Sequence, residues 1–553
     1  DTYVDSAYMG VAVVGRVLAA AGYRVGIIAQ PDISDGRDIA RLGHPALFWG
    51  VTAGSVDSLV ANYTATGKRR QKDDMTPGGA NTRRPDRALI VYSNLIRRYF
   101  KPTAPIVLGG IEASLRRISH YDFWSNRVRR SVLFDAKADY LLYGMAEQSV
   151  LQLAARLKAG QTPDTIRGLC YIRRELPPPE TDFPQPDIEL APHAALKDDD
   201  AEFSRMFRTF YRNSDPLTAR RLIQRQDSRY LVQNPPPAAL SSADLDRIYE
   251  LPYAREVHPY YAKSGPVRAL ETIRFSLTTH RGCYGECRFC AISVHQGRRV
   301  ISRSQASLLA EARRFSAHPA FKGVIADVGG PTANMYGFEC RRKAEKGACP
   351  DKGCLFPKIC TQLPVDHRPQ MELLGALGRL PGVRKVFVAS GLRYDLILAD
   401  PHAGAAYLER LLKNHISGQL KIAPEHSEKT VLDLMGKPDA ETLEAFLALF
   451  AKIKGKLSRP VFLTYYLMAA YPGCTRAHMR SLRAFALNTL RLLPEQVQVF
   501  TPTPATLASL MYLTQRDPLS GRKLFVEKNP GKKQQQKDLL QQRRPGRPRR
   551  RKP

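Results

Sequence analysis

The chain has 553 residues, with 84 Lys and Arg against 52 Asp and Glu, and a formal net charge of +32 at pH 7. Its length predicts two to four domains with a sizeable core, and no apolar run approaches the roughly 18 residues of a membrane span. Nine cysteines, odd in number and grouped, favour metal ligands in a reducing compartment over disulfides and predict a cytoplasmic protein. The chain starts at Asp1 rather than Met, so we expect further residues before it.

Residues 1–175 are predicted to form an amino-terminal α/β domain. Small and apolar residues at helical spacing run from Tyr8 to Ala21, and short apolar runs follow at strand length. The alternation of helix and strand predicts a doubly wound parallel sheet, whose ligands lie beyond the carboxyl ends of its strands. The expected strands are residues 25–29, 46–50, 88–92, 105–108 and 138–142.

Residues 176–271 differ in texture from the parts that flank them. Proline runs at 177–179 and 235–237 break helices and favour extended chain. Between them, residues 200–213 and 217–227 are polar helix candidates. We expect this stretch to wrap between two domains as a linker.

Three cysteines stand close together in the middle of the chain. Cys283, Cys287 and Cys290 have C-x3-C-x2-C spacing, with the aromatic Phe289 before the third. Three thiolates on one loop can hold three irons of a cubane cluster, which leaves the fourth iron open to a small molecule. A structural zinc takes four closed ligands, and an electron-transfer cluster takes four cysteines. A zinc site with one distant ligand is the alternative.

The surroundings of this loop predict a β/α barrel over residues 272–503. Residues 273–279 alternate like a strand, and Ser304 can cap the helix that follows the loop. Six βα units predict a parallel, partly closed barrel, with its chemistry at the carboxyl ends of the strands. Further strands are expected at 323–328, 383–389, 419–423, 461–466 and 496–500, and helices at 371–380, 403–415, 440–454 and 475–493.

The predicted strand ends carry glycine or polar residues. Gly329 and Gly330 end the second strand, and glycines let a ligand approach the backbone closely. Ser390 and Arg393 follow the third strand; a surface ion pair is the alternative for Arg393. The fourth strand ends at Glu425 and His426, which are expected to face the cavity. Cys474 follows the fifth strand; it is more typical of a small buried residue, and a substrate-side thiol is the alternative.

The cysteine spacing with its flanking residues resembles the radical S-adenosylmethionine (SAM) enzymes. The resemblance implies a partly open (β/α)6 barrel, a 4Fe–4S cluster whose open iron is chelated by SAM, and an electron donor such as flavodoxin or ferredoxin. Reductive cleavage of SAM then yields a 5′-deoxyadenosyl radical that abstracts hydrogen from a substrate. The residues it assigns are Cys283, Cys287 and Cys290 for the cluster, Phe289 near the adenine, Gly329 and Gly330 near the amino group, and Ser390 and Arg393 near the ribose or carboxylate.

Motifs outside the cysteine loop are similar to the YgiQ family of radical SAM proteins. The similarity reaches to about residue 503 and implies the cofactors and fold, while the substrate stays open. Where many radical SAM proteins have Gly-Gly-Glu, this chain has Gly-Gly-Pro, which leaves the SAM amino group to backbone carbonyls. The motifs lie at residues 50–54, 108–117, 234–237, 295–298, 329–334, 390–395 and 420–426.

Many radical SAM proteins also carry a cobalamin-binding domain at the amino end. Ligation by the protein needs a His in a D-x-H-x-x-G motif, and the candidate from Asp5 to Gly10 has none. Cobalamin is therefore doubtful. The domain binds cobalamin without a His, binds another ligand or only shapes the cavity, and the last two are favoured.

A second cysteine group lies in an insertion at 336–368, between the second and third barrel strands. Cys340, Cys349, Cys354 and Cys360 stand among Lys and Arg residues that favour thiolates. The insertion is longer than an ordinary βα loop, and predicts a second iron–sulfur cluster or a structural zinc, in which His367 could replace one Cys. Unligated loop cysteines are the alternative.

A carboxyl-terminal extension at 504–527 leads into residues 528–553, which hold eleven Lys or Arg and one Asp. This stretch has no core-forming pattern and is expected to be disordered. Its Gly-Arg-Pro at 546–548 resembles a minor-groove AT-hook, and predicts contact with nucleic acid or the ribosome; a basic solvated surface is the alternative. The rival function is a metal-stabilised nucleic-acid-binding protein without radical chemistry.

Overall fold

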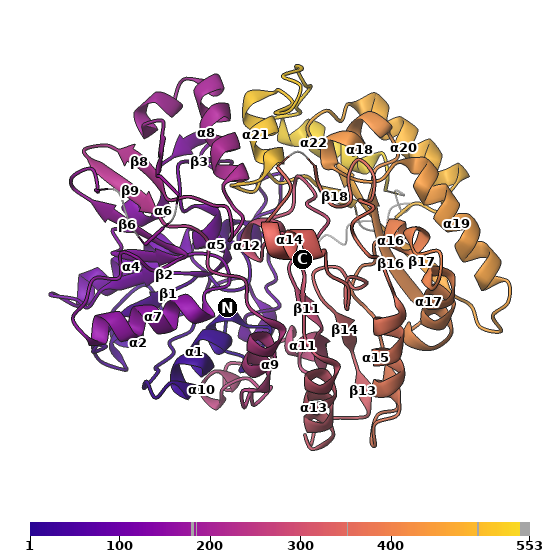
Figure 1. Ribbon diagram of the computed structural model, residues 1–553, viewed down its shortest axis with the longest axis horizontal. Coiled ribbons are helices and arrows are strands. Elements are labelled where there is room, and N and C mark those ends of the chain that lie inside the picture. Colours follow the sequence, from indigo (N-terminus) through magenta and orange to yellow (C-terminus); the bar gives the residue numbers. More distant parts are fainter. Residues whose placement is uncertain (179–181, 184, 351, 495–496, 542–553) are drawn as a thin grey trace, which may run out of the picture.

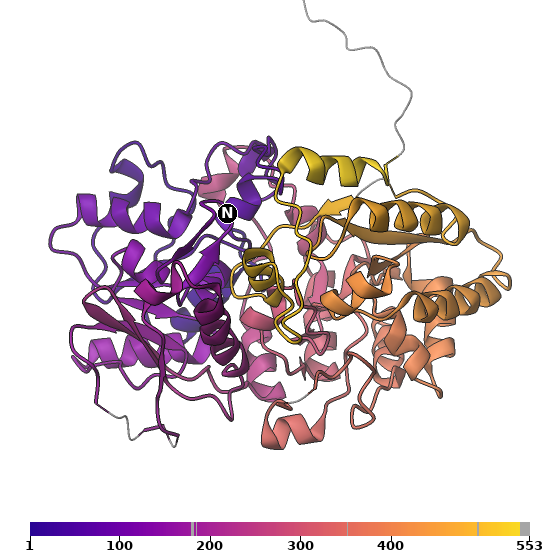
Figure 2. The same ribbon diagram turned by 90° about the horizontal axis from the view of Figure 1, so that it is seen from above.

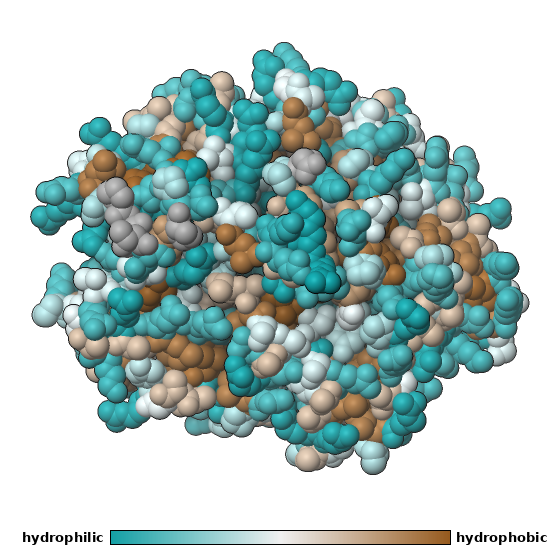
Figure 3. All heavy atoms as spheres, viewed as in Figure 1, coloured by the Kyte–Doolittle hydropathy of each residue, from teal (hydrophilic) through white to brown (hydrophobic). Residues whose placement is uncertain are grey.

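The computed structural model describes residues 1–178, 182–183, 185–350, 352–494 and 497–541. Two α/β halves lie side by side, the amino-terminal sheet and the carboxyl-terminal barrel (Figure 1). In the described part of the chain, no helix is long and apolar enough to cross a bilayer. The face seen in Figure 3 is largely polar, including the region of α14 (Arg341–Lys346).

The amino-terminal half is built on a seven-stranded sheet of order β1-β2-β5-β6-β9-β8-β7. β1, β2 and β5 are parallel, with Val107 opposite Tyr140, whereas β6 and β9 join antiparallel. The predicted α/β class with a parallel-rich sheet is confirmed, although the sheet is mixed rather than wholly parallel. The strands are β1 (Trp49–Val51), β2 (Ile106–Leu108), β5 (Tyr140–Leu142), β6 (Leu169–Arg173), β9 (Arg229–Gln233), β8 (Leu222–Gln226) and β7 (Ile188–Leu190).

Two strands predicted in this half are wrong. Residues 25–29 are irregular, and residues 88–92 begin a helix, α4, whose buried side chains Leu89, Leu95 and Ile96 follow helical spacing. An apolar run of five residues cannot distinguish strand from helix by itself. The helices here are α1 (Gly10–Ala20), α2 (Arg37–Ala40), α3 (Ser58–Asn62), η1 (Pro77–Gly79), α4 (Ala88–Tyr99), α5 (Gly110–Leu115), α6 (Val132–Asp135) and α7 (Glu147–Lys158).

Residues 176–271 form more than a linker. Their strands β7, β8 and β9 complete the amino-terminal sheet, so the helix predicted at 217–227 is wrong. Leu222, Ile223, Leu231 and Val232 are buried in the β8–β9 hairpin, and this burial outweighs the polar residues between them. The remaining elements are η2 (His193–Leu196), α8 (Asp200–Arg212), α9 (Ser242–Glu250), α10 (Pro259–Ala262) and α11 (Leu270–Ile273).

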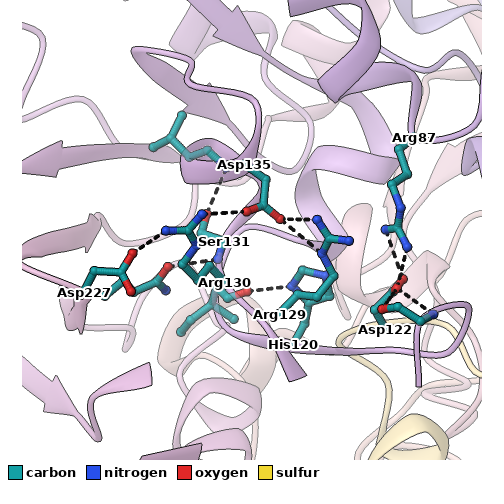
Figure 4. A network of polar contacts seen from close by, with 12 residues as sticks. Arg87, His120, Asp122, Arg129, Arg130, Ser131, Asp135 and Asp227 are labelled. Atoms are coloured by element: carbon teal, nitrogen blue, oxygen red, sulfur yellow. Dashed lines mark hydrogen bonds and ion pairs between the residues drawn. The ribbon is translucent and has the colours of Figure 1, made fainter. Parts of the chain in front are cut away.

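Ion pairs fasten the small hairpin β3 (His120–Asp122) and β4 (Arg127–Arg129) to its neighbours (Figure 4). Arg87 at the start of α4 binds Asp122, and Arg129 binds Asp135 in α6 with 2.6 Å between Nη2 and Oδ2. Arg130 joins Asp135 to Asp227, which lies in the β8–β9 turn. The network therefore joins the hairpin region to α4, to α6 and to the β8–β9 turn.

The barrel strands are all parallel, as predicted. β10 pairs with β14, β13 with β15, and β16 with β17 and then β18, while a parallel bridge from Leu392 to Ile422 joins the third and fourth positions. No pairing closes β18 onto β10 in the described ranges, so the barrel is open at that seam. The strands are β10 (Ser276–Thr278), β13 (Val324–Ile325), β14 (Asp327–Gly329), β15 (Lys385–Val386), β16 (Gln419–Glu425), β17 (Phe462–Ala469) and β18 (Val497–Val499).

The predicted barrel helices are confirmed, with α19 at the expected bounds. Ser304 caps α13 by accepting a hydrogen bond from the Ser307 amide, at 3.1 Å. The predicted helix at 403–415 ends in a π-helical turn, η3. The helices are α13 (Gln305–Ser316), α15 (Arg368–Gly378), α16 (Tyr394–Ala399), α17 (Gly404–Arg410), η3 (Leu411–His415), α18 (Lys429–Met435), α19 (Ala440–Lys454) and α20 (Arg476–Asn488).

The expected disorder from residue 528 onward is wrong for its first part. After α21 (Leu507–Thr514), α22 (Pro530–Asp538) packs against β17 and β18 (Figure 2). Lys533 is only 1% exposed, donates to the Tyr512 hydroxyl at 2.9 Å and lies 4.8 Å from the Phe123 ring centre. These aromatic contacts give a basic helix a buried face. The AT-hook-like residues 542–553 lie outside the described residues.

Candidate active site

The cysteine loop connects β11 (His280–Arg281) to α12 (Ile292–His295), directly after the first barrel strand. Gly282 has a φ of +78°, and a Cβ there would lie 1.8 Å from the Arg299 carbonyl oxygen, so only glycine allows the chain to turn here. Cys283 Sγ accepts from the Gly285 amide at 3.3 Å and lies 3.6 Å from Thr332 Oγ1, beyond the second strand. The loop thus faces the carboxyl ends of the strands.

The three thiols of the loop share one buried region. A Cβ at Gly285 would lie 3.3 Å from Cys283 Sγ and 3.7 Å from Cys287 Sγ. Burial and the neighbouring Cys287 raise the pKa of the Cys283 thiol, and raise that of Cys290 to about 12. A bound cation takes the place of the thiol protons and offsets the repulsion between neighbouring thiolates. The donor set therefore fits an iron–sulfur cluster.

A single metal ion fits the same residues less well. In the described chain, no three His, Cys, Asp or Glu side chains are arranged to hold one ion. A zinc ion binds its sulfurs at about 2.3 Å and so draws all its ligands to one point, whereas the cysteines of a cluster bind separate irons. Which of the two this loop binds stays a prediction.

Arg393 places a positive charge beside the loop. Its Nη1 lies 3.6 Å from Cys287 Sγ, and its Nε donates to Asp395 Oδ1 at 2.8 Å. Although burial opposes the charge, Asp395 raises the pKa of Arg393, which stays charged. The surface ion pair considered for Arg393 is in fact a buried pair that contacts Cys287 of the loop.

A chain of hydrogen bonds holds the Arg393 backbone in place. The Arg393 amide donates to Asn334 Oδ1, and Asn334 Nδ2 donates to the Arg393 carbonyl, both at 2.9 Å. His367 Nε2 lies 3.2 Å from the side-chain nitrogen of Asn334, and His367 Nδ1 lies 2.8 Å from Asp400 Oδ2. Both ring nitrogens are thus engaged away from the cysteines, so the interpretation of His367 as a substitute Cys ligand is wrong. The sequence reasoning missed Asn334, although it closes one of the quoted motifs.

Ser390 and the two glycines are engaged by neighbouring protein groups. The Ser390 hydroxyl donates to Asp327, which also accepts from the Ser390 amide at 3.1 Å. A Cβ at Gly329 would lie 2.9 Å from Ser390 Oγ, and one at Gly330 would lie 2.6 Å from the His280 ring. The glycines therefore allow the second and third strand ends to pack closely. Asp327 is a further residue that the sequence reasoning missed.

Phe289 is half-buried beside Tyr471, with their ring centres 6.2 Å apart and nearly perpendicular. Tyr471 is fully buried and donates to the Leu434 carbonyl at 2.9 Å. This edge contact leaves Phe289 on the cysteine loop and packed toward the fifth strand. Its predicted role beside an adenine stays a prediction.

The second cysteine group is only partly assembled. Cys340 and Cys354 are buried in one apolar cluster with Cys360 at its margin, and the Cys360 amide donates to the Cys354 carbonyl at 2.9 Å. Cys349 instead lies 2.7 Å from Arg342 Nη1. The described part of this insertion contains no converged single-ion site, so a second metal stays a prediction.

The insertion nevertheless contacts the first cysteine loop directly. Lys343 in α14 donates to Glu286 Oε1 at 3.2 Å and to the Arg298 carbonyl at 3.0 Å. The Tyr284 hydroxyl accepts from the Cys340 amide at 3.2 Å. Both contacts place the insertion over the outer side of the loop.

The amino-terminal half buttresses the other side of the loop. Arg281 forms a buried ion pair with Glu147 in α7, and His295 Nδ1 lies 2.9 Å from Ser114 Oγ in α5. A Cβ at Gly144, after β5, would lie 3.6 Å from the His295 carbonyl. Barrel residues thus occupy part of the sheet edge where a doubly wound domain binds its ligand. The absence of cobalamin stays a prediction.

Comparisons with known proteins place the chain. A family model described as Radical SAM N-terminal matches residues 1–276. A UPF0313 protein of Fusobacterium nucleatum is 54% identical over 99% of this chain and 95% of its own length. The chain belongs to the UPF0313 family. UPF0313 is the YgiQ family, so the resemblance predicted from the motifs is confirmed and the chain is a radical SAM family protein.

Relatives from other lineages agree with this assignment. A UPF0313 protein of Thermotoga neapolitana is 45% identical over 96% of this chain and 92% of its own length. One from Methanosarcina acetivorans is 44% identical over 99% of this chain and 76% of its own length. Membership in the radical SAM family implies a 4Fe–4S cluster, SAM and an electron donor.

Among solved structures, the radical SAM methyltransferase TsrM from Kitasatospora setae, with tryptophan and aza-SAM bound, has a TM-score of 0.47 and 14% identity. It covers 90% of this chain and 72% of its own. A second TsrM structure, with cobalamin and a [4Fe–4S] cluster bound, has a TM-score of 0.46, covering 91% and 71%. The ligands named in these two structures are those bound by TsrM.

Proposed function

We propose that this UPF0313 protein binds a 4Fe–4S cluster through Cys283, Cys287 and Cys290 and cleaves SAM reductively. The observation that carries the proposal is the grouping of three half-buried thiols with Arg393 at the carboxyl ends of a parallel, open barrel. When bound, the cluster would supply the electron that breaks the sulfonium bond of SAM, and the resulting 5′-deoxyadenosyl radical would abstract hydrogen from the substrate.

The protein's own groups would bind and orient. Arg393 would place a positive charge 3.6 Å from Cys287, one of the sulfurs that would hold the cluster. Phe289 would pack near the adenine, and Gly329 and Gly330 would leave backbone groups accessible to the SAM amino group. Since Asp327 accepts from both the Ser390 hydroxyl and the Ser390 amide, we expect Ser390 to meet the ribose through its backbone carbonyl.

Anaerobic reconstitution with iron and sulfide tests this proposal. Wild type should show a 4Fe–4S spectrum and form 5′-deoxyadenosine from SAM and dithionite, whereas Cys283→Ala should lose both. Cys474→Ala is the matched control, because Cys474 is buried against His426, 3.5 Å from Nε2, and belongs to neither cysteine group. An intact cluster in Cys283→Ala, or no 5′-deoxyadenosine from wild type, would contradict the proposal.

We further propose that the insertion binds a second metal through Cys340, Cys354 and Cys360, with Cys349 recruited from Arg342. Two of these thiols are already buried together and beside Lys343. Reconstituted wild type should then carry about seven to eight irons rather than four; zinc with about four irons would assign a structural site. Cys354→Ala should remove the additional metal alone. About four irons and no zinc would contradict both forms.

For the substrate we propose a nucleic acid or ribosomal component, with a peptide or metabolite as the alternative. The support is the net charge of +32, because basic proteins attract phosphates through counterion release. Modified nucleosides, proteins and metabolites should be compared between cells with and without the protein. An altered peptide or metabolite beside an unchanged RNA profile would reverse this ranking. A chain that binds RNA but never cleaves SAM would be the metal-stabilised binding protein instead.

A further inference from the structure

The sheet of β16 and β17 has one buried face and one exposed face. Alternate side chains are buried in the core beneath the helices that lie outside the barrel (Figure 1): Leu420, Ile422, Leu463 and Tyr465. The side chains between them point to the opposite, inner face of the open barrel. On this face Phe462 is 56% exposed and Tyr466 is 38% exposed. Large apolar side chains grouped in water on one face mark a site that binds another molecule.

Lysines lie among the aromatic rings of this face. The strand register pairs Lys421 with Thr464, which stands midway between Phe462 and Tyr466 on the same face. The ammonium nitrogen of Lys454 lies 5.4 Å from the centre of the Phe462 ring. Neither lysine forms an ion pair with the residues that the structure describes. The face therefore combines exposed rings with positive charges that no carboxylate balances.

The neighbouring strand β15 extends the face with the same two kinds of side chain. Val386 and Val388 are buried in the core, so Lys385 and Phe387 point to the inner face. Lys385 is exposed and Phe387 is half-buried. A parallel bridge beyond β15 joins this part of the chain to β16. We name this set the aromatic face: Lys385, Phe387, Lys421, Phe462 and Tyr466.

A basic rim borders the aromatic face at the amino ends of the parallel strands. Arg384 Nε donates to the Lys322 carbonyl at 3.1 Å, which joins the segments that lead into β13 and β15. Arg459 Nη2 donates to the Ile416 carbonyl at 3.2 Å, which joins those that lead into β16 and β17. No Asp or Glu occurs in these four segments, residues 317–323, 379–384, 413–418 and 455–461. The exposed basic residues of the rim are Lys322, Arg379, Arg384, Lys413 and Lys456.

A polymer that offers both phosphates and flat bases matches this arrangement. Aromatic side chains on a protein surface stack the bases of single strands, while a positively charged surface follows the backbone. Phe462 and Tyr466 are four residues apart on β17, which is roughly 13 Å, so one strand lying along β17 can stack on both rings. A duplex keeps its bases paired and offers none to the rings. An acidic peptide would match the lysines but would leave the exposed rings without a reason.

We propose that the aromatic face binds a single-stranded nucleic acid. Its bases stack on the three rings, and its phosphates contact Lys385, Lys421 and the basic rim. A strand that follows β17 from Phe462 to Tyr466 runs toward the carboxyl ends of the barrel strands, where the cysteine loop lies. The inference rests on the proposed function, which ranks a nucleic acid first among substrates, and it assigns the residues that hold that substrate.

Fluorescence anisotropy with a labelled single-stranded RNA of about twelve nucleotides tests the stacking. Phe462→Ala and Tyr466→Ala should each weaken binding about fivefold or more, because each removes a base stack. Phe462→Trp keeps a ring and should bind like wild type. Tyr99→Ala is the matched control, since Tyr99 is also 38% exposed but ends α4 in the amino-terminal half. Wild-type affinity in both alanine variants of the face would overturn the proposal.

The salt dependence tests the phosphate contacts. Each phosphate neutralised on a single strand contributes about 0.7 to the slope of log affinity against log salt. The double variant Lys385→Gln with Lys421→Gln should therefore reduce this slope by about 1.4. Lys429→Gln is the control and should leave the slope unchanged, because Lys429 is exposed on α18 and pairs with Asp433 at 3.0 Å. An unchanged slope in the double variant would contradict the phosphate role.

Crosslinking separates this face from the basic carboxyl-terminal residues. RNA that contains 4-thiouridine is irradiated on the full chain, and the attached peptides are identified by mass spectrometry. Crosslinks at residues 385–387, 421 or 462–466 support the proposal, whereas crosslinks confined to residues 528–553 overturn it. Oligoglutamate that displaces the RNA and loses affinity in the same alanine variants would assign the face to an acidic protein partner instead. The proposed function fails separately, if wild type binds RNA at this face but forms no 5′-deoxyadenosine.

Discussion

Asp395→Asn provides a test of the charge balance beside the cysteine loop. Arg393 and Asp395 form a buried pair, and Arg393 Nη1 lies 3.6 Å from Cys287 Sγ. The substitution keeps the shape of the side chain and removes its negative charge. Since arginine cannot lose its proton in a protein, the variant retains a positive charge next to Cys287 that no carboxylate balances.

The expected size follows from the distance. The centre of a cluster would lie about 3 Å beyond the Cys287 sulfur, so an added electron and the guanidinium would be about 7 Å apart. At an effective dielectric constant of about 20, unit charges at that distance interact by about 2 kcal/mol. For a one-electron couple this corresponds to about 100 mV. Asp395 cancels part of this attraction in wild type, so its removal should raise the midpoint potential by several tens of millivolts.

Redox titration of the reconstituted cluster, followed by electron paramagnetic resonance, measures the shift. Asp366→Asn is the matched control, because Asp366 pairs with Arg368 at the surface of the insertion and should leave the potential unchanged. The double variant Arg393→Gln with Asp395→Asn removes both charges and should return toward wild type. A potential in Asp395→Asn that is unchanged or more negative would refute the reasoning.

Three other predictions concern the framework. Glu311→Gln should lower the free energy of unfolding by about 3 kcal/mol or more, since it leaves two buried arginines without their carboxylate. Thermal unfolding measures this loss. Glu345→Gln is the control and should have no effect, because the ion pair of Glu345 is exposed. Burial lowers the pKa of Lys533 from its ordinary 10.5 to about 8, so the folded state loses this proton first and stability should rise between pH 8 and 10.5. Lys533→Met should show no such rise. A wild-type free energy of unfolding that stays constant between these pH values would contradict the prediction. Deleting residues 542–553, which are rich in arginine, should weaken nonspecific RNA binding and reduce its salt dependence without changing SAM cleavage. Filter binding at two salt concentrations measures both effects, and RNA affinity that persists after the deletion would contradict the prediction.

Local spacing was enough to predict much of the barrel and its loop. The C-x3-C-x2-C pattern identifies the family because three ligands on one loop need no information from distant residues. Helix α19 was predicted at its observed bounds, since Asp439 caps it and its apolar residues recur with the helical period. The parallel barrel strands were predicted from the regular alternation of strand and helix, although their ends differ by a few residues and the expected second strand is divided into β13 and β14.

Other features depended on contacts between residues far apart in the chain. Residues 88–92 are as apolar as a strand, but they form a helix because α4 packs one face against β1 and α6. The strands of 176–271 join the amino-terminal sheet through pairings with β6, which no local pattern specifies. Likewise, α22 is ordered although its sequence is basic and polar, because Lys533 and Gln536 find buried partners on Tyr512 and Ala470.

The residues of the candidate site also fall into two groups, those that the sequence indicated and those that only the tertiary structure brought together. The sequence by itself predicted the three cysteines and their cofactor class, since ligand type and spacing are local properties. Only the tertiary structure decided that Arg393 reaches Cys287 and that Asp327 takes the Ser390 hydroxyl. These relations depend on the segments that follow the second and third barrel strands, which hydrogen bonds join to each other. Strand register and helix packing set such distances, and both are fixed by the whole core.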